Sequence, residues 1–419
     1  MIRFLSIFII FALTACGQTS GSTGINISPA NDTLQNYISV GNGINGTIEA
    51  MAVYDDKLYV AGKFNNSDDG QDYTVAYWDG KTWVYLRNAI NGARTLHSDG
   101  TVMSLAVYNN ELYVGGCFAK VGDQSVYNIT KWNGKAWSNV GGGLKGYFAA
   151  ATEFGNHKKV LRYTDGFVNY MAVYNNELYV SGCFDSTSDN IRLHNFAKWD
   201  KKKWTPVGKG ANDNIRALLE YKNELYAGGE FDTLDGKRFK HIAKWNGSKW
   251  TSVGDGVDWG DVRCLSVYDN DLYVGGCFKR VGDSTILGIA KWDGNKWASV
   301  SKGMSISQYG SVGSLEVYNN ELYAGGLFDS AGYVSARNIA IWNKREWRPL
   351  KASEVIASDT ITLSSANVNG KLCYVGVSGG VNALVKYKNN FYIAGTFYTL
   401  QSHHGMNIVI WKKGITSHN

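Results

Sequence analysis

The chain has 419 residues, and its composition combines 49 glycines and 13% aromatic residues with only 3 prolines. Abundant glycine and aromatic residues are typical of many strands joined by tight turns, and they argue against a helical or a disordered chain. The formal net charge is +6, but the lysines recur along the whole chain instead of gathering in one run. We therefore expect no nucleic-acid-binding function.

The first residues predict a bacterial lipoprotein signal peptide. Arg3 precedes an apolar run, Phe4 to Leu13, that is too short to span a bilayer. The segment Leu13-Thr14-Ala15-Cys16 resembles the lipobox, in which the cysteine is lipidated and becomes the new N-terminus after cleavage. We expect removal of residues 1–15, a lipid anchor on Cys16 and a flexible tether over residues 16–35. The alternative is an ordinary secretory peptide with an incidental cysteine.

Seven copies of one phrase follow the tether. LAVYNNELYVGGCF from Leu105 is a typical copy: two β-rich runs flank a pair of residues that favours a tight turn. A second hairpin follows, as in the segment where Asn246-Gly247 lies between Trp245 and Trp250. The shortest interval between copies, from Leu218 to Leu265, is 47 residues, which is the size of a propeller blade. The copies begin at Met51, Leu105, Met171, Leu218, Leu265, Leu315 and Leu384.

The tryptophans recur in pairs at a spacing of five residues, and we expect them to pack between neighbouring blades. The last repeat has only three strands, ending at Trp411, whereas residues 37–43 match the fourth-strand phrase of residues 250–256. The sequence thus predicts an all-β fold: one seven-bladed β-propeller over residues 36–419, made of four-stranded antiparallel blades and closed by an N-terminal strand that completes the last blade. Residues 351–383 fit this pattern least well and leave room for an extra hairpin or blade.

The hydrophobic-Tyr-Val-Gly-Gly phrase, followed by a variable stretch and Trp-Asp/Asn-x3-Trp, resembles the kelch and galactose-oxidase-type propeller repeat. The chain departs from that repeat by placing Trp where Tyr is usual. It also replaces the glycine doublet at Ala61-Gly62, Ser181-Gly182 and Ala394-Gly395. The resemblance implies a propeller fold and no particular substrate. A galactose-oxidase-like centre would also need a Cys–Tyr crosslink with His and Tyr copper ligands, and no such arrangement can be assigned.

The His-Glu-x-x-His pattern of metalloproteases is missing from the sequence. Residues 41–46 match a dinucleotide fingerprint but lead into a strand, where a helix N-terminus is needed. Residues 65–70 resemble the start of a calcium loop, yet Ala76 stands where a carboxylate is required. We assign no catalytic residue, no metal site and no cofactor.

Besides Cys16 there are five cysteines, an odd number, so at least one thiol cannot pair within the chain. Cys117, Cys183 and Cys277 hold the same repeat position, and sites on different blades should be too far apart to bridge. We expect them to be small buried residues. Cys264 and Cys277 share a blade, but they lie diagonally unless a β-bulge shifts the register.

One face of the expected propeller stands out. The connections between the second and third strands, and between one blade and the next, are long and irregular, whereas the hairpin turns on the other face are tight. Trp259 lies outside the paired tryptophan positions, either as a binding residue or as a loop residue folded onto the blade edge. The candidate binding residues on this face are Arg192, His194, Arg238, His241, Trp259, Tyr333, Arg337, His403 and His404.

We expect a binding module rather than an enzyme: a monomeric lipoprotein of the bacterial cell envelope that binds a protein or glycan on its long-loop face. Its membrane partner is the bilayer that holds the lipid anchor. Gly17 follows Cys16 instead of an Asp, so outer-membrane sorting is the expectation. Two alternatives remain open: a carbohydrate- or alcohol-acting enzyme of galactose-oxidase type, and an envelope-assembly scaffold.

Overall fold

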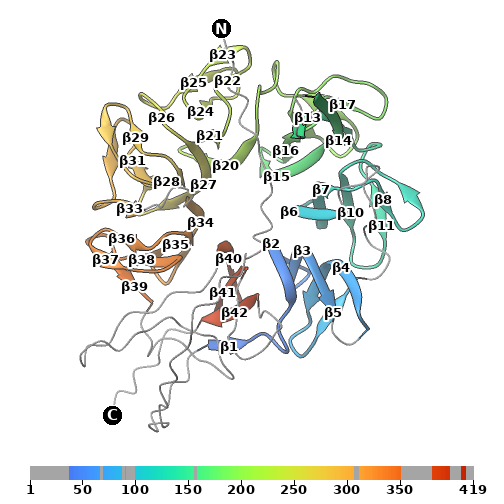
Figure 1. Cartoon of the computed structure of the whole chain (residues 1–419), viewed down its shortest axis with the longest axis horizontal. Helices are drawn as coiled ribbons and strands as arrows, with labels where there is room; N and C mark the ends of the chain where they lie inside the picture. Colours follow the sequence, from blue (N-terminus) through green and yellow to red (C-terminus); the bar gives the residue numbers. More distant parts are fainter. Residues whose placement is uncertain are drawn as a thin grey trace.

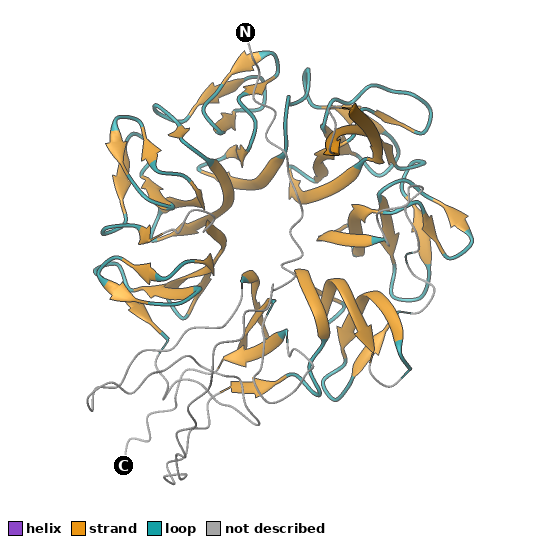
Figure 2. Ribbon diagram, in the orientation of Figure 1, coloured by secondary structure: helices purple, strands orange, loops and turns teal. Residues whose placement is uncertain are grey.

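The computed structural model describes residues 37–66, 69–86, 90, 100–154, 158–305, 311–350, 380–396 and 407–411. Within these ranges every regular element is a β-strand. Four-stranded antiparallel sheets stand around a central axis, as in a β-propeller (Figures 1 and 2). The described part of the chain holds no helix long and apolar enough to cross a membrane.

Six of the four-stranded sheets each use one continuous stretch of chain, and their strands follow in sequence order. The first strand of each sheet lies nearest the axis and the fourth lies outermost (Figure 1). The sheets consist of β2(Asn45–Tyr54), β3(Lys57–Asn66), β4(Gln71–Trp78) and β5(Trp83–Tyr85); β6(Thr101–Tyr108), β7(Glu111–Cys117), β10(Ile129–Trp132) and β11(Trp137–Asn139); β15(Phe167–Tyr174), β16(Glu177–Cys183), β18(Phe196–Trp199) and β19(Trp204–Pro206); β20(Ile215–Tyr221), β21(Glu224–Gly229), β24(Ile242–Trp245) and β25(Trp250–Ser252); β27(Asp261–Tyr268), β28(Asp271–Cys277), β31(Ile289–Trp292) and β32(Trp297–Ser299); β34(Ser311–Tyr318), β35(Glu321–Leu327), β38(Ile339–Trp342) and β39(Trp347–Pro349).

Another four-stranded sheet joins the two ends of the described chain. It combines β40(Val381–Tyr387), β41(Asn390–Gly395) and β42(Ile408–Trp411) with β1(Tyr37–Ser39). β1 runs antiparallel to β42, with Tyr37 opposite Trp411 and Ser39 opposite Val409. The pairing that the sequence predicts between these segments is therefore present.

The turn between the first two strands of a sheet follows from its residues. Asn109 and Asn110 both adopt positive φ angles, 51° and 56°, which a two-residue hairpin turn requires and which Asn tolerates well. The tyrosine that ends the first strand then reaches the same turn of the next sheet: the Tyr108 hydroxyl donates to the Asn176 carbonyl oxygen at 2.8 Å. Equivalent bonds join Tyr54 to Asn110, Tyr221 to Asn270, Tyr268 to Asn320 and Tyr318 to Asn389.

The paired tryptophans pack between sheets, which confirms the prediction. Trp204 Nε1 donates to the Val140 carbonyl oxygen at 3.0 Å, and Val140 follows the last strand of the preceding sheet. Gly141 comes next with a φ of 54°, and a Cβ there would lie 2.5 Å from the Trp199 ring. The glycine after the fourth strand thus admits the ring pair of the neighbouring sheet. Equivalent bonds join Trp83 to Val40, Trp297 to Val253 and Trp347 to Val300.

The apolar core lies between sheets rather than within one. One buried cluster contains Val40, Ile48 and Val60 together with Tyr392 and Ile408, so it joins the first and the last sheet. The other clusters likewise combine residues of neighbouring sheets. Because each sheet buries its faces only against its neighbours, the sheets depend on one another for stability.

In the six sheets that use one stretch of chain, the hairpin between the third and fourth strands is longer than the tight turn that an Asn-Gly pair suggests. Trp132 pairs directly with Trp137, so four residues form the loop between them. The Asn133 side chain stabilises this loop, since its Oδ1 accepts from the backbone nitrogens of Lys135 at 3.0 Å and Ala136 at 2.9 Å. The asparagine serves here as a side-chain acceptor, a usual role for Asn and Asp in turns.

In each four-stranded sheet the strand nearest the axis contains a β-bulge near its beginning. In β27, Val262 pairs with Gly276 and Cys264 with Gly275, which leaves Arg263 as the extra residue. Cys264 therefore does not face Cys277, and no disulfide joins the four described cysteines, Cys117, Cys183, Cys264 and Cys277. The seven bulged residues are Glu49, Met103, Asn169, Arg216, Arg263, Gly313 and Asn382.

Candidate functional site

The long connections that the structure describes lie on one face, which we call the connection face. It comprises residues 118–128, 141–146, 184–195, 208–214, 231–241, 254–260, 278–288, 301–305 and 328–338. This face is more regular than the sequence suggests, because its connections form short strands that pair with one another. These strands are β8(Lys120–Val121), β9(Gln124–Ser125), β12(Leu144–Lys145), β17(Ser186–Thr187), β22(Thr233–Leu234), β23(Lys237–Arg238), β26(Val257–Asp258), β29(Arg280–Val281), β30(Ser284–Thr285), β33(Met304–Ser305), β36(Ser330–Ala331) and β37(Val334–Ser335).

The pairing of these strands links neighbouring sheets. β26, which follows one sheet, pairs with β29 in the long connection of the next sheet, and β29 pairs with β30. β12 pairs with β17, and β33 with β36, in the same manner. The interpretation of these connections as irregular loops is thus corrected: backbone pairing between segments distant in sequence makes them an ordered layer.

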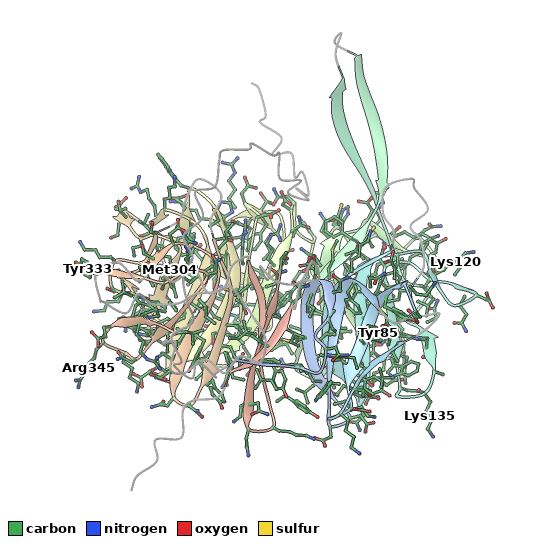
Figure 3. All side chains as sticks on the ribbon, turned by 60° about the horizontal axis from the view of Figure 1, so that its bottom comes forward. Tyr85, Lys120, Lys135, Met304, Tyr333 and Arg345 are labelled. Atoms are coloured by element: carbon green, nitrogen blue, oxygen red, sulfur yellow. The ribbon has the colours of Figure 1, made fainter. Side chains whose placement is uncertain are left out.

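A longer hairpin extends from the connection face. β13(Tyr147–Phe154) pairs with β14(Lys158–Asp165) over eight residues, from Tyr147 opposite Asp165 to Phe154 opposite Lys158. Figure 3 shows the hairpin projecting well beyond the sheets. Two glycines hold its base, where the Gly166 nitrogen donates to the Gly146 carbonyl oxygen at 2.9 Å. The sequence had indicated only an insertion here.

Two of the predicted binding residues share one cavity. Arg192 and His194 line it with Asp185, Ser186 and Asn190, and its volume is about 380 Å³. The loop is shaped by local bonds, since Thr187 Oγ1 accepts from the Ile191 nitrogen at 3.0 Å. The cavity offers a carboxylate, a hydroxyl, an amide, a guanidinium and an imidazole, and so presents both donors and acceptors to a polar ligand.

Asn195, next to His194, has a structural role. Its Oδ1 accepts from the Phe184 nitrogen at 3.1 Å, and its Nδ2 donates to the Ala211 carbonyl oxygen at 3.1 Å. Asn128 makes the same two bonds in the preceding sheet. The asparagine fixes the left-handed backbone before the third strand, so His194 is held on the exposed side of a rigid turn.

His241 occupies the position of these asparagines in its own sheet. Its φ is 59°, and its carbonyl oxygen accepts from the Gly229 nitrogen at 3.0 Å. The side chain is half-buried, and its Nδ1 has no hydrogen-bond partner within the described part of the chain. His241 therefore shapes the backbone turn before β24. Arg238 on β23 is exposed, opposite Thr233.

In the described part of the chain two aromatic residues are strongly exposed, and neither lines the cavity. Trp259 is 72% exposed with a φ of 60°, so it is not folded onto a sheet edge. Tyr333 is 82% exposed, and Figure 3 shows it at the periphery of the molecule. Lys302 Nζ lies 5.7 Å from the centre of the Tyr333 ring. Arg337, close by in sequence, is also exposed.

The structure thus brings together Arg192 and His194, whereas the other predicted residues that it describes lie in the connections of several sheets. His403 and His404 lie outside the described residues, as do Cys16, the tether and residues 351–379. Among the side chains that are described, no three His, Cys, Asp or Glu residues could hold a metal ion together.

Sequence reasoning missed a group of polar residues at the inner ends of β20, β27 and β34, which we call the inner cluster: Asn214, Arg216, Glu230, Asp261, Arg263 and Ser311. Its members bond across strands and sheets. Arg216 Nε donates to Glu230 Oε1 at 2.5 Å, and Asn214 Nδ2 donates to Glu230 Oε2 at 3.1 Å. Arg263 Nε donates to Asp261 Oδ2 at 3.0 Å, and Arg263 Nη1 to Ser311 Oγ at 2.7 Å.

The only sequence signal for the inner cluster was a charged residue inside an apolar strand, as at Arg216 and Arg263. Such a residue can be accommodated because the β-bulge turns it out of the alternating pattern. Burial raises the pKa of the Glu230 carboxyl, and the nearby Arg216 opposes this shift. The cluster is therefore partly removed from water while it stays charge-balanced.

Two thiols at the ends of β16 and β28, Cys183 and Cys277, are poor nucleophiles. Burial raises the pKa of Cys183 to about 11, and nearby Asp185 adds to the shift. Burial also raises the pKa of Cys277, although Arg263 opposes the shift. Because the thiolate is the reactive form, only a small fraction of either cysteine is in the reactive form at neutral pH.

Comparisons with known proteins give only structural likenesses. No protein-family model matches the chain. No curated protein matches it either. Its backbone is similar to the computationally designed Ika8 protein, at 15% identity and a TM-score of 0.43, over 90% of this chain and 99% of that one. It is also similar to YjhT, at 14% identity and a TM-score of 0.39, over 74% of this chain and 99% of that one. The all-β architecture of repeated four-stranded sheets stands on the strand pairing of this chain itself.

Proposed function

We propose that this chain is a lipid-anchored, kelch-like β-propeller of the bacterial cell envelope that binds a protein or glycan ligand through its connection face. The observation that carries the proposal is the cavity lined by Arg192 and His194 on an ordered layer of paired connections. A rigid scaffold with polar groups in a concavity is what a binding module needs.

Contacts between the first and last sheets support a closed ring of seven blades. Trp83 Nε1 donates to the Val40 carbonyl oxygen at 2.6 Å. Asn407 Nδ2 donates to Ile44 at 3.0 Å and Asn382 Nδ2 to Ile48 at 3.0 Å, both to backbone oxygens. In a closed ring these bonds would hold the first and last blades together, as equivalent bonds do between other neighbouring blades.

Deletion of residues 36–43 tests the closure. It removes β1 and the buried Val40, and so uncovers an edge of β42. We expect the domain to lose at least about 2 kcal/mol of unfolding free energy in urea titrations, from the burial of Val40 alone, together with cooperativity. Deletion of tether residues 17–24 is the control. An unchanged unfolding curve for the first deletion would show that the ring is not closed by this strand.

The lipid anchor follows from the lipobox-like segment that ends at Cys16. In Cys16→Ser the chain should leave the membrane fraction for the soluble fraction, with its thermal unfolding unchanged. Retention of this variant in the membrane pellet would contradict the anchor. For the unaltered chain, sucrose-gradient separation of inner and outer membranes tests the proposed outer-membrane location.

Ligand binding is tested with a glycan array and with capture from envelope extracts, using the full chain in detergent. We expect Arg192→Ala and His194→Ala to weaken the captured interaction, whereas Lys135→Ala, in an exposed turn between third and fourth strands, should not. A turnover assay on sugars and alcohols, with and without copper, accompanies these experiments. Product formation would contradict a purely binding function.

A further inference from the structure

Trp259, on the connection face, adjoins the inner cluster through Asp261 at the start of β27. Trp259 and Asp261 are separated by a single residue, so their Cα atoms lie at most about 7 Å apart. Gly260, between them, has a φ of 154°, and a Cβ there would overlap the Cys277 carbonyl oxygen. The backbone at Gly260 thus packs closely against β28. This close approach holds the exposed Trp259 directly beside the start of β27.

Two polar atoms of the inner cluster can each form a further hydrogen bond. Asp261 is buried, with 8% of its surface exposed. Its Oδ2 accepts a hydrogen bond from Arg263. Its Oδ1 accepts no hydrogen bond from a described residue, and it is not one of the described side-chain atoms that are both fully buried and without a partner. Arg263 uses Nε and Nη1, while Nη2 has no partner within the same described ranges. An open acceptor and an open donor therefore belong to two side chains that are bonded to each other.

The charges of the cluster favour a neutral ligand. Arg216 and Arg263 carry two positive charges, and Glu230 and Asp261 carry two negative charges, all within bonded pairs. Because these charges balance, the cluster attracts neither anions nor cations strongly. A hydroxyl group both donates and accepts, whereas a carboxylate only accepts and a guanidinium only donates. Adjacent hydroxyls on one ligand would satisfy both open atoms.

Access from solvent is consistent with a ligand site. The Arg263 side chain is 31% exposed and that of Arg216 is 29% exposed. Figure 1 places β20, β27 and β34 as neighbours around the central axis, nearest to it in their sheets. The cluster is thus held by three rigid strands, while Trp259 adds a large apolar ring at its border.

We infer that Trp259, Asp261 and Arg263 form a saccharide-binding subsite at the inner end of the connection face. The indole ring stacks against the apolar face of a sugar ring. Asp261 Oδ1 and Arg263 Nη2 bind neighbouring hydroxyls of that sugar, and Glu230 and Arg216 hold these two side chains in place. This inference rests on the proposed function and names its ligand class.

The test uses the full chain in detergent and a panel of neutral oligosaccharides: maltopentaose, cellopentaose and chitopentaose. We expect at least one to bind in calorimetric titrations, and Trp259→Ala to weaken its binding about tenfold or more. Trp259→Phe should keep most of the affinity. Lys135→Ala, in an exposed turn outside the connection face, is the control and should not change the affinity.

Chemical protection adds a measurement on the unaltered protein. Oxidation of Trp259 by N-bromosuccinimide, followed by peptide mass spectrometry, should slow at least about fivefold when the sugar occupies about 80% or more of the site. If a sugar binds but neither the variant nor the protection responds, while Arg192→Ala weakens it, this inference fails and the proposed function stands. If none of the panel binds while another ligand is captured on the connection face, the saccharide subsite is likewise overturned.

Discussion

The hydroxyl of Tyr387 on β40 donates a hydrogen bond to the Asp56 carbonyl oxygen, 2.6 Å away in the turn between β2 and β3. The two residues are 331 positions apart, and they join the last sheet to the first. The same bond links Tyr268 to the Asn320 carbonyl oxygen at 2.9 Å between two sheets that follow each other in sequence.

Tyr387→Phe should therefore lower the unfolding free energy by about 1 kcal/mol, because the Asp56 oxygen loses its donor. Urea titration measures this loss. Tyr268→Phe is the matched control, and equal losses would indicate that the first and last sheets stay together as firmly as other neighbours. A loss in Tyr268→Phe alone would mean that the Tyr387 contact contributes nothing.

Glu316 on β34 should make stability depend on pH. Burial raises the pKa of its carboxyl from 4.5 to about 7, and Lys386 only partly opposes this. The folded protein thus holds a proton that the unfolded chain releases, so the unfolding free energy should fall as pH rises from about 4.5 to 7 and level off above.

Glu316→Gln removes this dependence. The unfolding free energy of the variant should equal that of the unaltered protein at pH 4 and exceed it at pH 8. Urea titrations at the two pH values measure both. Glu220→Gln, at an exposed position of β20, is the control for the loss of one negative charge. A Glu316 variant that is no more stable at pH 8 would contradict the buried, charged carboxyl.

Alanine substitutions at two glycines should distinguish the stability cost of a left-handed backbone from the cost of close packing. Gly247 has a φ of 94° and open space around it, whereas Gly254 has a φ of 52° and a Cβ there would lie 2.9 Å from both Trp292 and Trp297. Gly247→Ala should cost about 1–2 kcal/mol from the left-handed backbone alone. Gly254→Ala should cost about 3 kcal/mol or more, because the tryptophan pair must also move. Thermal unfolding that shows equal costs would argue against close packing at Gly254.

His241→Asn should stabilise the protein by about 1 kcal/mol. Asparagine tolerates the left-handed backbone better, and it can accept from the Phe231 nitrogen as Asn338 does from Phe328 at 3.0 Å. The converse change, Asn338→His, should destabilise by a similar amount. If His241→Asn instead lowers the unfolding free energy, the unpartnered imidazole nitrogen has a structural role that these contacts do not explain.

The repeated sheets and their order could be predicted because the signals for them are local. A pair such as Asn109-Asn110 sets a hairpin turn by its own backbone preference, and tryptophans five residues apart mark the two ends of a four-residue loop. The partner of β1 could also be predicted, since residues 37–43 repeat the phrase of other fourth strands.

The candidate site could be predicted only in part. Arg192 and His194 are close in sequence, and a single loop brings them to one cavity. The inner cluster was missed because Arg216 and Glu230 are 14 residues apart, and Arg263 and Ser311 are 48 apart. Only a β-bulge, strand pairing and the packing of one sheet on the next bring such side chains together. Those are contacts between distant segments, and the tertiary structure alone decides them.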